Sequence, residues 1–182
     1  PGQTVLVLGT GGVSIFALQL AKAHGARVIV TSSSDEKLAR ARELGADETI
    51  NYVADEAWHK TARKLTGGRG VDHVVEVGGA GTLEKSILSC AVGGHIAVIG
   101  VLSGIKSPVL VTPILMGYLR LQGILVGHRA SFEALNAFLD QHQLHPVISH
   151  TFPMAQAREA FDLMARGGHF GKIALEGDAG SA

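Results

Sequence analysis

Apolar and polar positions follow one another along this chain in blocks of two kinds. Short runs rich in valine, isoleucine and leucine alternate with longer stretches in which apolar residues recur every three or four positions. The short runs predict strands buried on both faces, and the longer stretches predict helices with one apolar face. The expected strands cover residues 5–8, 26–31, 48–51, 73–77, 95–101 and 121–126, and the expected helices cover residues 13–23, 35–44, 55–65 and 82–91.

This regular order of elements predicts the fold class. Strands that alternate with helices form βαβ units with right-handed crossovers, which place the strands in a parallel sheet. We therefore expect an α/β fold, a doubly wound parallel sheet of about six strands with helices on both faces. Acids at Asp35 and Glu36 and a glycine at Gly45 mark the start and stop of the second helix.

A glycine-rich turn joins the first predicted strand to an apolar helix in the segment TVLVLGTGGVSIFALQLAKA. Gly9 allows a sharp turn, and Gly11, without a Cβ, would let a pyrophosphate approach the backbone and the start of the helix. Ser14 stands where G-x-G-x-x-G has its third glycine, a position that serves close packing of helix on strand. The motif predicts a dinucleotide-binding Rossmann domain; the alternative is a turn in which glycine serves geometry alone.

Glycines also follow other predicted strands. Gly9, Gly78, Gly100 and Gly127 each stand at the carboxyl end of a strand, where ligands bind in sheets of this kind. Any one of them can be explained as turn punctuation. Together they favour a ligand that lies across this edge of the sheet.

The end of the second strand indicates which dinucleotide is bound. An NAD-binding protein normally has an acid there for the ribose 2′-hydroxyl. This chain instead has Ser32, Ser33 and Ser34, followed by Lys37. Hydroxyls and a cation suit a 2′-phosphate, so NADP is preferred over NAD. Ser34 can equally be a helix cap and Lys37 a solvated surface lysine.

Composition excludes several classes of function. The 182 residues contain 16 Lys plus Arg and 16 Asp plus Glu, so no basic excess points to nucleic acid. No apolar stretch has transmembrane length and no signal-peptide layout is present, so neither a membrane partner nor secretion is expected. The single cysteine, Cys90, fits a cytoplasmic location and is expected to be buried in an apolar helix.

Other catalytic chemistries find little support. His142, His145 and His150 invite a metal hypothesis, but Pro146 interrupts them and no cysteine or acid completes a familiar spacing, so a surface loop is preferred. No serine stands at the apex of a nucleophile elbow, and no Lys-Ser or Lys-Thr follows the glycines as in a P-loop. We therefore assign no catalytic residue and no metal ligand within the chain.

Nearly the whole chain resembles the medium-chain dehydrogenase/reductase family. The first stretch to match is PGQTVLVLGTGGVSIFALQLAKAHGARVIVTSSSDEKLARARELGADETINY, followed in order by GVDHVVEVGG, GGHIAVIGVLSG, LRLQGILVGHR and FPMAQAREAFDLMARGGHFGKIAL. Each later segment is weakly specific alone, but their order and spacing are typical of the family. Within it, the chain is most similar to zinc-type alcohol dehydrogenases and NADP-dependent quinone oxidoreductases.

The resemblance implies roles for individual positions. It places the pyrophosphate along Gly9, Thr10, Gly11, Gly12 and Val13, the 2′-phosphate beside Ser32, Ser33, Lys37 and Tyr52, the adenosine at Val77 and Gly78, and the nicotinamide end at Ile99, Gly100, Val101, Ile124 and Val126. Tyr52 can also be an ordinary surface residue. Val77, Ile99 and Val126 can be core residues of their strands.

The family also implies a larger protein around this chain. We expect residues 1–130 to be the dinucleotide-binding domain and residues 131–182 to return toward an upstream catalytic domain, which would hold any zinc. The chain is interpreted as a piece of that protein, able to bind cofactor but with little or no turnover alone. A homodimer through the strand at Leu121–Val126, a small-molecule substrate and apolar surface along the tail are further expectations.

The function expected from these observations is hydride transfer between nicotinamide and an alcohol, carbonyl, quinone or enone. A rival from another class is a cofactor-binding module without catalysis, such as a redox sensor. A short-chain reductase is disfavoured because Tyr52 and Tyr118 have no lysine four positions on.

Overall fold

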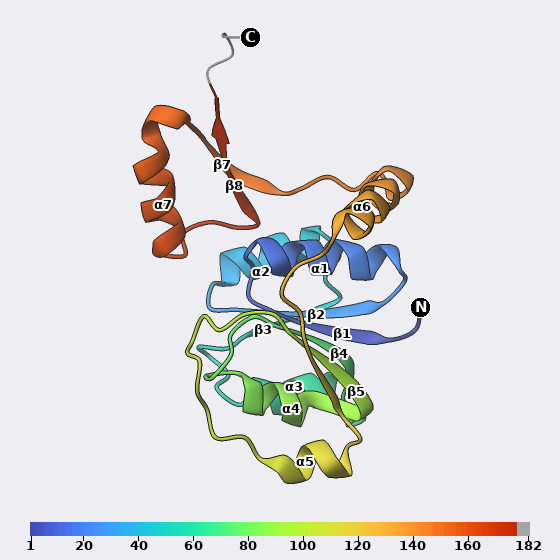
Figure 1. The fold of residues 1–182 in the computed structure, drawn as a ribbon. Coiled ribbons are helices and arrows are strands. Elements are labelled where there is room, and N and C mark those ends of the chain that lie inside the picture. Colours follow the sequence, from blue (N-terminus) through green and yellow to red (C-terminus); the bar gives the residue numbers. More distant parts are fainter. Residues whose placement is uncertain (178–182) are drawn as a thin grey trace.

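A six-stranded parallel sheet forms the centre of the computed structural model, which describes residues 1–177 (Figure 1). Its strand order is β3-β2-β1-β4-β5-β6, and every neighbouring pair is parallel. The strands are β1 (Thr4–Leu8), β2 (Arg27–Ser32), β3 (Glu48–Asn51), β4 (Val71–Glu76), β5 (Cys90–Val98) and β6 (Arg120–Gly123). This is the order of a Rossmann fold, so the predicted fold class is confirmed.

Helices cover both faces of the sheet (Figure 1). Those of the first face are α1 (Gly12–Ala23) and α2 (Asp35–Glu43), and those of the second are α3 (Trp58–Leu65) and α4 (Leu83–Ser89). Side chains of β1 alternate between two apolar cores: Val7 packs with the α1 side chains, and Leu6 packs with Trp58 and Ile87 of the other face. Burial on both faces explains why the strands are continuous apolar runs.

The sequence signals for α2 act as predicted. Ser34 is the N-cap, and its hydroxyl accepts a hydrogen bond of 3.3 Å from the Lys37 amide. Asp35 and Glu36 occupy the first turn, where they favour the positive end of the helix dipole. The chain leaves the helix through Gly45, at a φ of +99° that L-residues rarely adopt.

Two predicted boundaries are wrong. Cys90 was expected inside a helix, but α4 ends at Ser89 and Cys90 begins β5, because its backbone pairs with Val71 of β4. The sixth strand was expected to reach residue 126, but it ends at Gly123. Its neighbour β5 ends at Val98, whose carbonyl accepts a 2.9 Å hydrogen bond from the Ile124 amide, so residues 125 and 126 have no partner residues left in β5.

Smaller differences concern the other elements. The predicted helix over residues 55–65 begins only at Trp58, and the predicted strand over residues 95–101 ends at Val98. A short helix, α5 (Val111–Met116), was not predicted. Among the helices of the described residues, none is long and apolar enough to cross a membrane.

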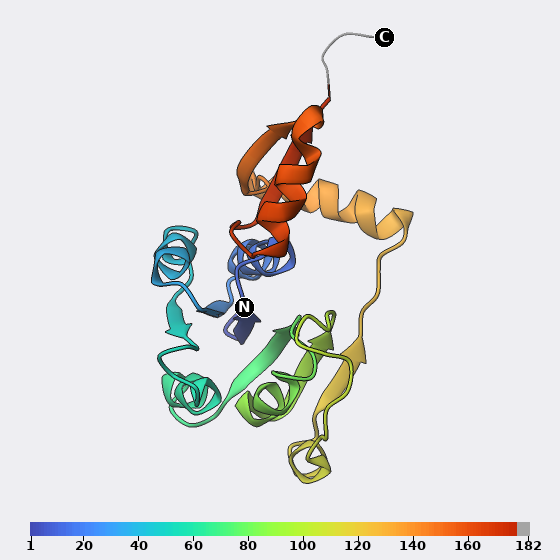
Figure 2. The ribbon, with the colours of Figure 1, turned by 90° about the vertical axis from the view of Figure 1, so that its left-hand side faces the viewer.

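Residues after β6 form a second layer above α1 and α2, as Figure 2 shows. It consists of α6 (Arg129–His142), β7 (Ile148–Pro153), a 3₁₀ turn (Met154–Gln156), α7 (Ala157–Ala165) and β8 (Lys172–Glu176), and β7 pairs with β8 in a two-stranded parallel sheet. The predicted C-terminal segment thus includes β8 at its GKIAL run, and its residues 178–182 lie outside the described part. The segment carries exposed apolar side chains, among them Phe132, Ile148 and Phe161.

Phe170 joins this layer to the main sheet. Its ring is 2% exposed and belongs to the same core cluster as Val7 and Leu18. The guanidinium carbon of Arg40, a residue of α2, lies 4.4 Å from the centroid of this ring. One residue late in the chain therefore completes a core that the first strand begins.

Replacement of Phe170 by alanine is expected to lower the free energy of unfolding by about 3–5 kcal/mol, because it leaves a cavity in the core. Urea unfolding followed by circular dichroism measures the change. Phe161→Ala is the control, since that ring is 60% exposed; its loss should stay within about 0.5 kcal/mol. Equal losses in the two variants would contradict the role of Phe170.

Candidate functional site

A cleft of about 600 Å³ lies at the carboxyl ends of β1 and β2, between the glycine turn and the segment from α7 to β8. Strand order reverses beside β1, and ligands bind at such a switch point in open α/β sheets. The cleft is lined both by residues of the main α/β domain and by the turn that follows α7. The first group is Leu8, Gly9, Thr10, Gly11, Gly12, Val13, Ser14, Ser32, Ser33, Lys37, Tyr52, Val77 and Leu102, and the second is Met164, Ala165, Arg166, Gly167 and His169.

A second cavity of about 410 Å³ adjoins the cleft and shares several lining residues with it, among them Gly9, Tyr52 and Val77. It continues past the end of β4 and reaches Trp58 and the start of α4. The other residues of its wall are Leu8, Thr31, Glu56, Gly78, Gly81, Thr82, Lys85, Leu102 and Ser103. The two spaces together run along the sheet edge, as an elongated ligand would require.

The glycines of the turn have different reasons to be glycine. Gly9 has a φ of +75°, so the sharp turn itself requires it. Gly11 has a φ of −77°, which any residue adopts, and a Cβ built on it meets no described atom within 4 Å. A Cβ on Gly12 would lie 2.8 Å from Cε of Lys172. Internal packing therefore does not explain Gly11, and the space beside it is open to a ligand.

The start of α1 is arranged as an anion site. Gly11 is the N-cap, no side chain caps the helix, and its first turn contains no acid. Gly12, Val13 and Ser14 of this first turn line the cleft, at the positive end of the helix dipole. Ser14 is 2% exposed and donates a 2.6 Å hydrogen bond to the Leu8 carbonyl, so the residue at the third motif position ties α1 to β1.

Lys37 reaches across the cleft. Its ammonium donates a 2.5 Å hydrogen bond to the carbonyl of Gly167, in the turn that follows α7. Ser32 is buried beside it, and Arg166 adds a second cation to the same lining. Lys37 is thus part of the cleft, while Ser34 takes the alternative role of helix cap.

The surroundings of His169 show that positive charge is concentrated at the cleft. Burial lowers the pKa of its imidazole, and the nearby charges of Lys37, His150 and Lys172 lower it further. Its Nδ1 is buried, with no hydrogen-bond partner among the described residues. The residues named above as the lining of the 600 Å³ cleft include no Asp or Glu within the described part of the chain. Such a surface favours an anion.

The predicted site residues divide into two groups. Those brought together at the cleft are Gly9, Thr10, Gly11, Gly12, Val13, Ser32, Ser33, Lys37, Tyr52 and Val77, with Gly78 in the adjoining cavity. Those that line neither space are Ile99, Gly100, Val101, Ile124 and Val126. Val101 and Val126 are 55% and 83% exposed, beyond the ends of their strands. Geometry therefore supports the phosphate and adenosine positions more directly than the nicotinamide positions.

Two strand-end glycines have a packing reason of their own. A Cβ on Gly100 would collide with the carbonyl of Val77, and one on Gly78 would collide with the hydroxyl of Thr82. The absence of a side chain at these positions lets loops of the sheet edge lie against each other. A ligand is not needed to explain either glycine.

Sequence reasoning missed the wall formed by the turn between α7 and β8. Met164, Arg166, Gly167 and His169 line the cleft there, and the Gly171 amide donates a 2.9 Å hydrogen bond to the Thr10 carbonyl. The basic, glycine-containing run ARGGHFGK was the available signal. Sequence reasoning also missed Glu76, whose buried carboxylate accepts hydrogen bonds from the loop after β4.

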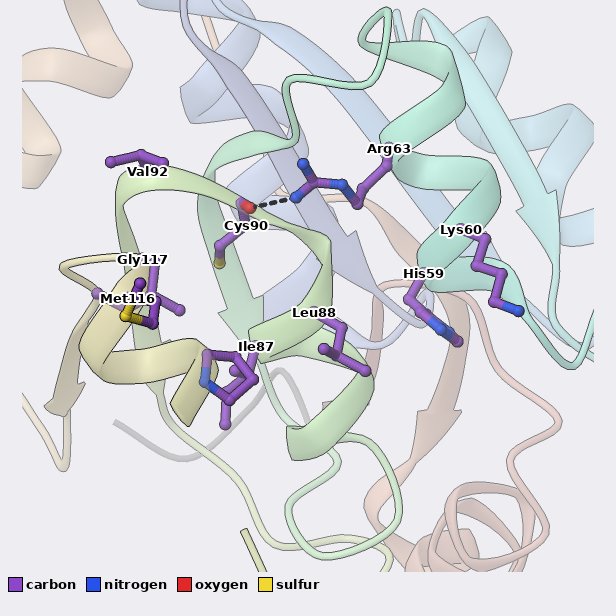
Figure 3. Close-up of a pocket in the computed structure, with 11 residues that line it drawn as sticks. His59, Lys60, Arg63, Ile87, Leu88, Cys90, Val92, Met116 and Gly117 are labelled. Atoms are coloured by element: carbon purple, nitrogen blue, oxygen red, sulfur yellow. Dashed lines mark hydrogen bonds between the residues drawn. The ribbon is translucent and has the colours of Figure 1, made fainter. Parts of the chain in front are cut away.

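A third cavity, of about 510 Å³, lies away from the cleft, between α3, α4 and α5 (Figure 3). None of the predicted cofactor positions lines it. Cys90 does, and its carbonyl accepts a 2.7 Å hydrogen bond from Arg63. Burial raises the pKa of the Cys90 thiol to about 12, although Arg63 opposes the shift, so the thiol is not a nucleophile near neutral pH.

Within residues 1–177, no group of three or more His, Cys, Asp or Glu side chains could hold a metal ion.

Comparisons with known proteins identify the family. A family model described as zinc-binding dehydrogenase matches residues 12–141. A zinc-type alcohol dehydrogenase-like protein of Schizosaccharomyces pombe is 44% identical over 98% of the chain, which covers 53% of that relative. The chain spans about half the length of the curated relatives it matches.

Solved structures agree with this result. A crystal structure of an NAD-dependent alcohol dehydrogenase has a TM-score of 0.90 and 38% identity, covering 97% of this chain and 51% of that one. A mycobacterial protein complexed with NADPH has a TM-score of 0.82 and 30% identity, covering 95% of this chain and 57% of that one. The neighbours thus bind nicotinamide dinucleotides of both kinds. The resemblance inferred from the sequence is confirmed, with only the cofactor-binding half represented.

Proposed function

The chain belongs to the zinc-binding dehydrogenase family, and from this premise we propose that it is the NADP(H)-binding part of an oxidoreductase. Residues 1–130 are the proposed dinucleotide domain, and residues 131–182 the segment that returns toward a catalytic domain. The substrate of the whole protein is proposed to be an alcohol or carbonyl, or a quinone or enone. When bound, the nicotinamide supplies the hydride chemistry, and the protein supplies binding and orientation.

The observation that carries this proposal is the cationic lining at the end of β2. Ser32 and Ser33 stand at the end of β2, where an NAD-binding protein would have an acid for the ribose 2′-hydroxyl, and Lys37 and Arg166 line the same cleft. A 2′-phosphate brings a charge near −2 and needs hydrogen-bond donors, which these side chains offer. A carboxylate at the same point would repel it. These features support NADP over NAD.

The start of α1 is the proposed pyrophosphate site. The first turn of the helix lines the cleft with its positive dipole end, and the open space beside Gly11 leaves room for phosphate oxygens near the backbone. Lys172 lies over Gly12 and can balance the charge from the opposite wall. The adjoining cavity past Val77 and Gly78 is then the place for the adenosine. The nicotinamide positions, from Ile99 to Val126, rest on the family resemblance.

We also propose a homodimer through β6. This strand pairs with β5 on one side, and its four residues are all exposed. Apolar side chains continue beyond it, with Leu125 92% and Val126 83% exposed. An exposed edge flanked by apolar residues is a template for pairing with another strand, and a second copy supplies one with two-fold symmetry.

Gly11→Ala is expected to leave the fold intact but weaken NADPH binding by about tenfold or more, because the new Cβ enters the phosphate space. The backbone at Gly11 accepts alanine, so the free energy of unfolding should change by less than about 1 kcal/mol. Titration calorimetry and urea unfolding give the two quantities. Gly9→Ala is the contrast, since its positive φ predicts a loss of about 1–2 kcal/mol in stability. Unchanged affinity in Gly11→Ala would contradict a phosphate beside this residue.

Lys37→Ala is expected to weaken NADPH binding about tenfold to a hundredfold, the value of a hydrogen bond to a charged group, with little change for NADH. Calorimetric titration of both dinucleotides against the wild-type chain and the variant provides the measurement. Lys64→Ala is a matched control, because Lys64 is an exposed lysine of α3 outside the cleft. Tighter binding of NADH than NADPH by the wild-type chain would overturn the 2′-phosphate assignment.

Leu121→Lys is expected to convert a dimer into a monomer, since a charge on the β6 edge opposes strand pairing. Light scattering after size exclusion gives the mass of each species. Leu175→Lys serves as the control: Leu175 on β8 is 38% exposed, against 36% for Leu121. A wild-type chain that stays monomeric at high concentration would exclude this interface.

A further inference from the structure

A buried carboxylate stands at the end of β4, behind the wall of the adenosine cavity. Glu76 is the last residue of the strand and is 0% exposed. Its Oε1 accepts hydrogen bonds from the Gly78 amide at 2.8 Å and the Gly79 amide at 3.0 Å, and from the Thr82 hydroxyl at 2.6 Å. Its Oε2 accepts one from the Ser86 hydroxyl of α4. Four donors from one loop and one helix therefore converge on a single side chain.

Core packing does not explain a carboxylate at this position. Val74, two residues earlier on the same face of β4, is apolar and 1% exposed, as expected beneath α4. Burial of an acid costs several kcal/mol unless hydrogen bonds compensate, and an apolar residue of similar size is often no less stable. Glu76 instead fixes the conformation of the loop after β4, because the Gly78 and Gly79 amides must both point at its carboxylate.

That loop forms one wall of the adenosine cavity. Val77, Gly78, Gly81 and Thr82 all line the cavity, and Gly79 holds a φ of +82° that the turn requires. The Thr82 hydroxyl bonded to Glu76 is the same group that a Cβ on Gly78 would strike. The position of the wall therefore depends on the carboxylate behind it.

We propose that Glu76 is a positioning residue for the adenosine half of the cofactor, held in place by Ser86. The inference rests on the proposed function, because it assigns the adenosine to this cavity. Glu76 acts through the loop and lies behind the lining. Loss of its hydrogen bonds should therefore weaken the binding of NADPH and of NADH equally, because both contain the adenosine. Lys37→Ala, in contrast, is expected to weaken the binding of NADPH alone.

Two serines of α4 allow a matched test. Ser86 and Ser89 are both 0% exposed, and neither lines the adenosine cavity. The Ser86 hydroxyl donates to Glu76, whereas the Ser89 hydroxyl donates a 2.8 Å hydrogen bond to the Lys85 carbonyl of its own helix. Ser86→Ala therefore releases one oxygen of the carboxylate, and Ser89→Ala removes a comparable buried hydroxyl without touching it.

Ser86→Ala is expected to raise the Kd for NADPH and for NADH by about the same factor, roughly fivefold, a typical coupling through a packed network. Ser89→Ala should leave both constants within about a factor of two of the wild type. Calorimetric titration of the chain gives the constants, and urea unfolding of the same samples shows whether the two variants lose similar stability. A loss of affinity confined to Ser86→Ala at matched stability supports the positioning role.

Other outcomes overturn the inference in distinguishable ways. If the wild-type chain binds neither dinucleotide, the proposed function fails, and this inference with it. If it binds both but Ser86→Ala binds as well as the wild type, Glu76 serves the fold alone. If Ser86→Ala does not fold, Glu76→Gln replaces it: the amide keeps the size of the side chain, and a Kd unchanged for both dinucleotides would exclude the role.

Discussion

Parallel pairing of β1 on both of its edges is the constraint on which the rest of this structure depends. β1 hydrogen-bonds to β2 on one side and β4 on the other, and its apolar residues are buried in the two cores. The connections to these neighbours must therefore leave the sheet over opposite faces. The loops that follow β1 and β4 therefore diverge from each other at the carboxyl ends of these strands, and the cleft lies between them. The strand order thus places the glycine turn after β1 in the cleft.

Charge in the cleft comes from two layers of the molecule. Lys37 belongs to the second βα unit, whereas Arg166 and Lys172 belong to the layer that Phe170 joins to the core, with Lys172 lying against Gly12. The hydrogen bond from Lys37 to Gly167 joins residues 130 positions apart. The segment from α7 to β8 therefore forms one wall of the cleft at which we propose that the phosphates bind, and the glycine turn forms another.

Two buried polar side chains hold the loops at the edge of the sheet that faces this cleft. Ser14 binds the carbonyl at the end of β1, and Glu76 collects four donors at the end of β4. Both are buried, so each bond narrows the conformations available to the loop beside it. Three glycines at this edge have different roles. The positive φ of the turn requires Gly9, and close packing against Val77 requires Gly100. Of the three, only Gly11 faces open space.

The sequence by itself determined the order of strands and helices from β1 to β5, the parallel sheet and the glycine turn. These features depend on local properties, namely apolar runs such as residues 5–8 and glycine at Gly9, which act over a few positions. It also pointed to Ser32 and Lys37, because both follow a strand whose end is recognisable. Tertiary structure alone decided that Cys90 pairs with Val71 instead of lying in a helix, that Glu76 accepts hydrogen bonds from the loop after β4, and that Arg166, Gly167 and His169 line the same cleft as the glycine turn. Each of these depends on contacts between segments distant in the chain, and no local pattern of residue types specifies which partners will meet.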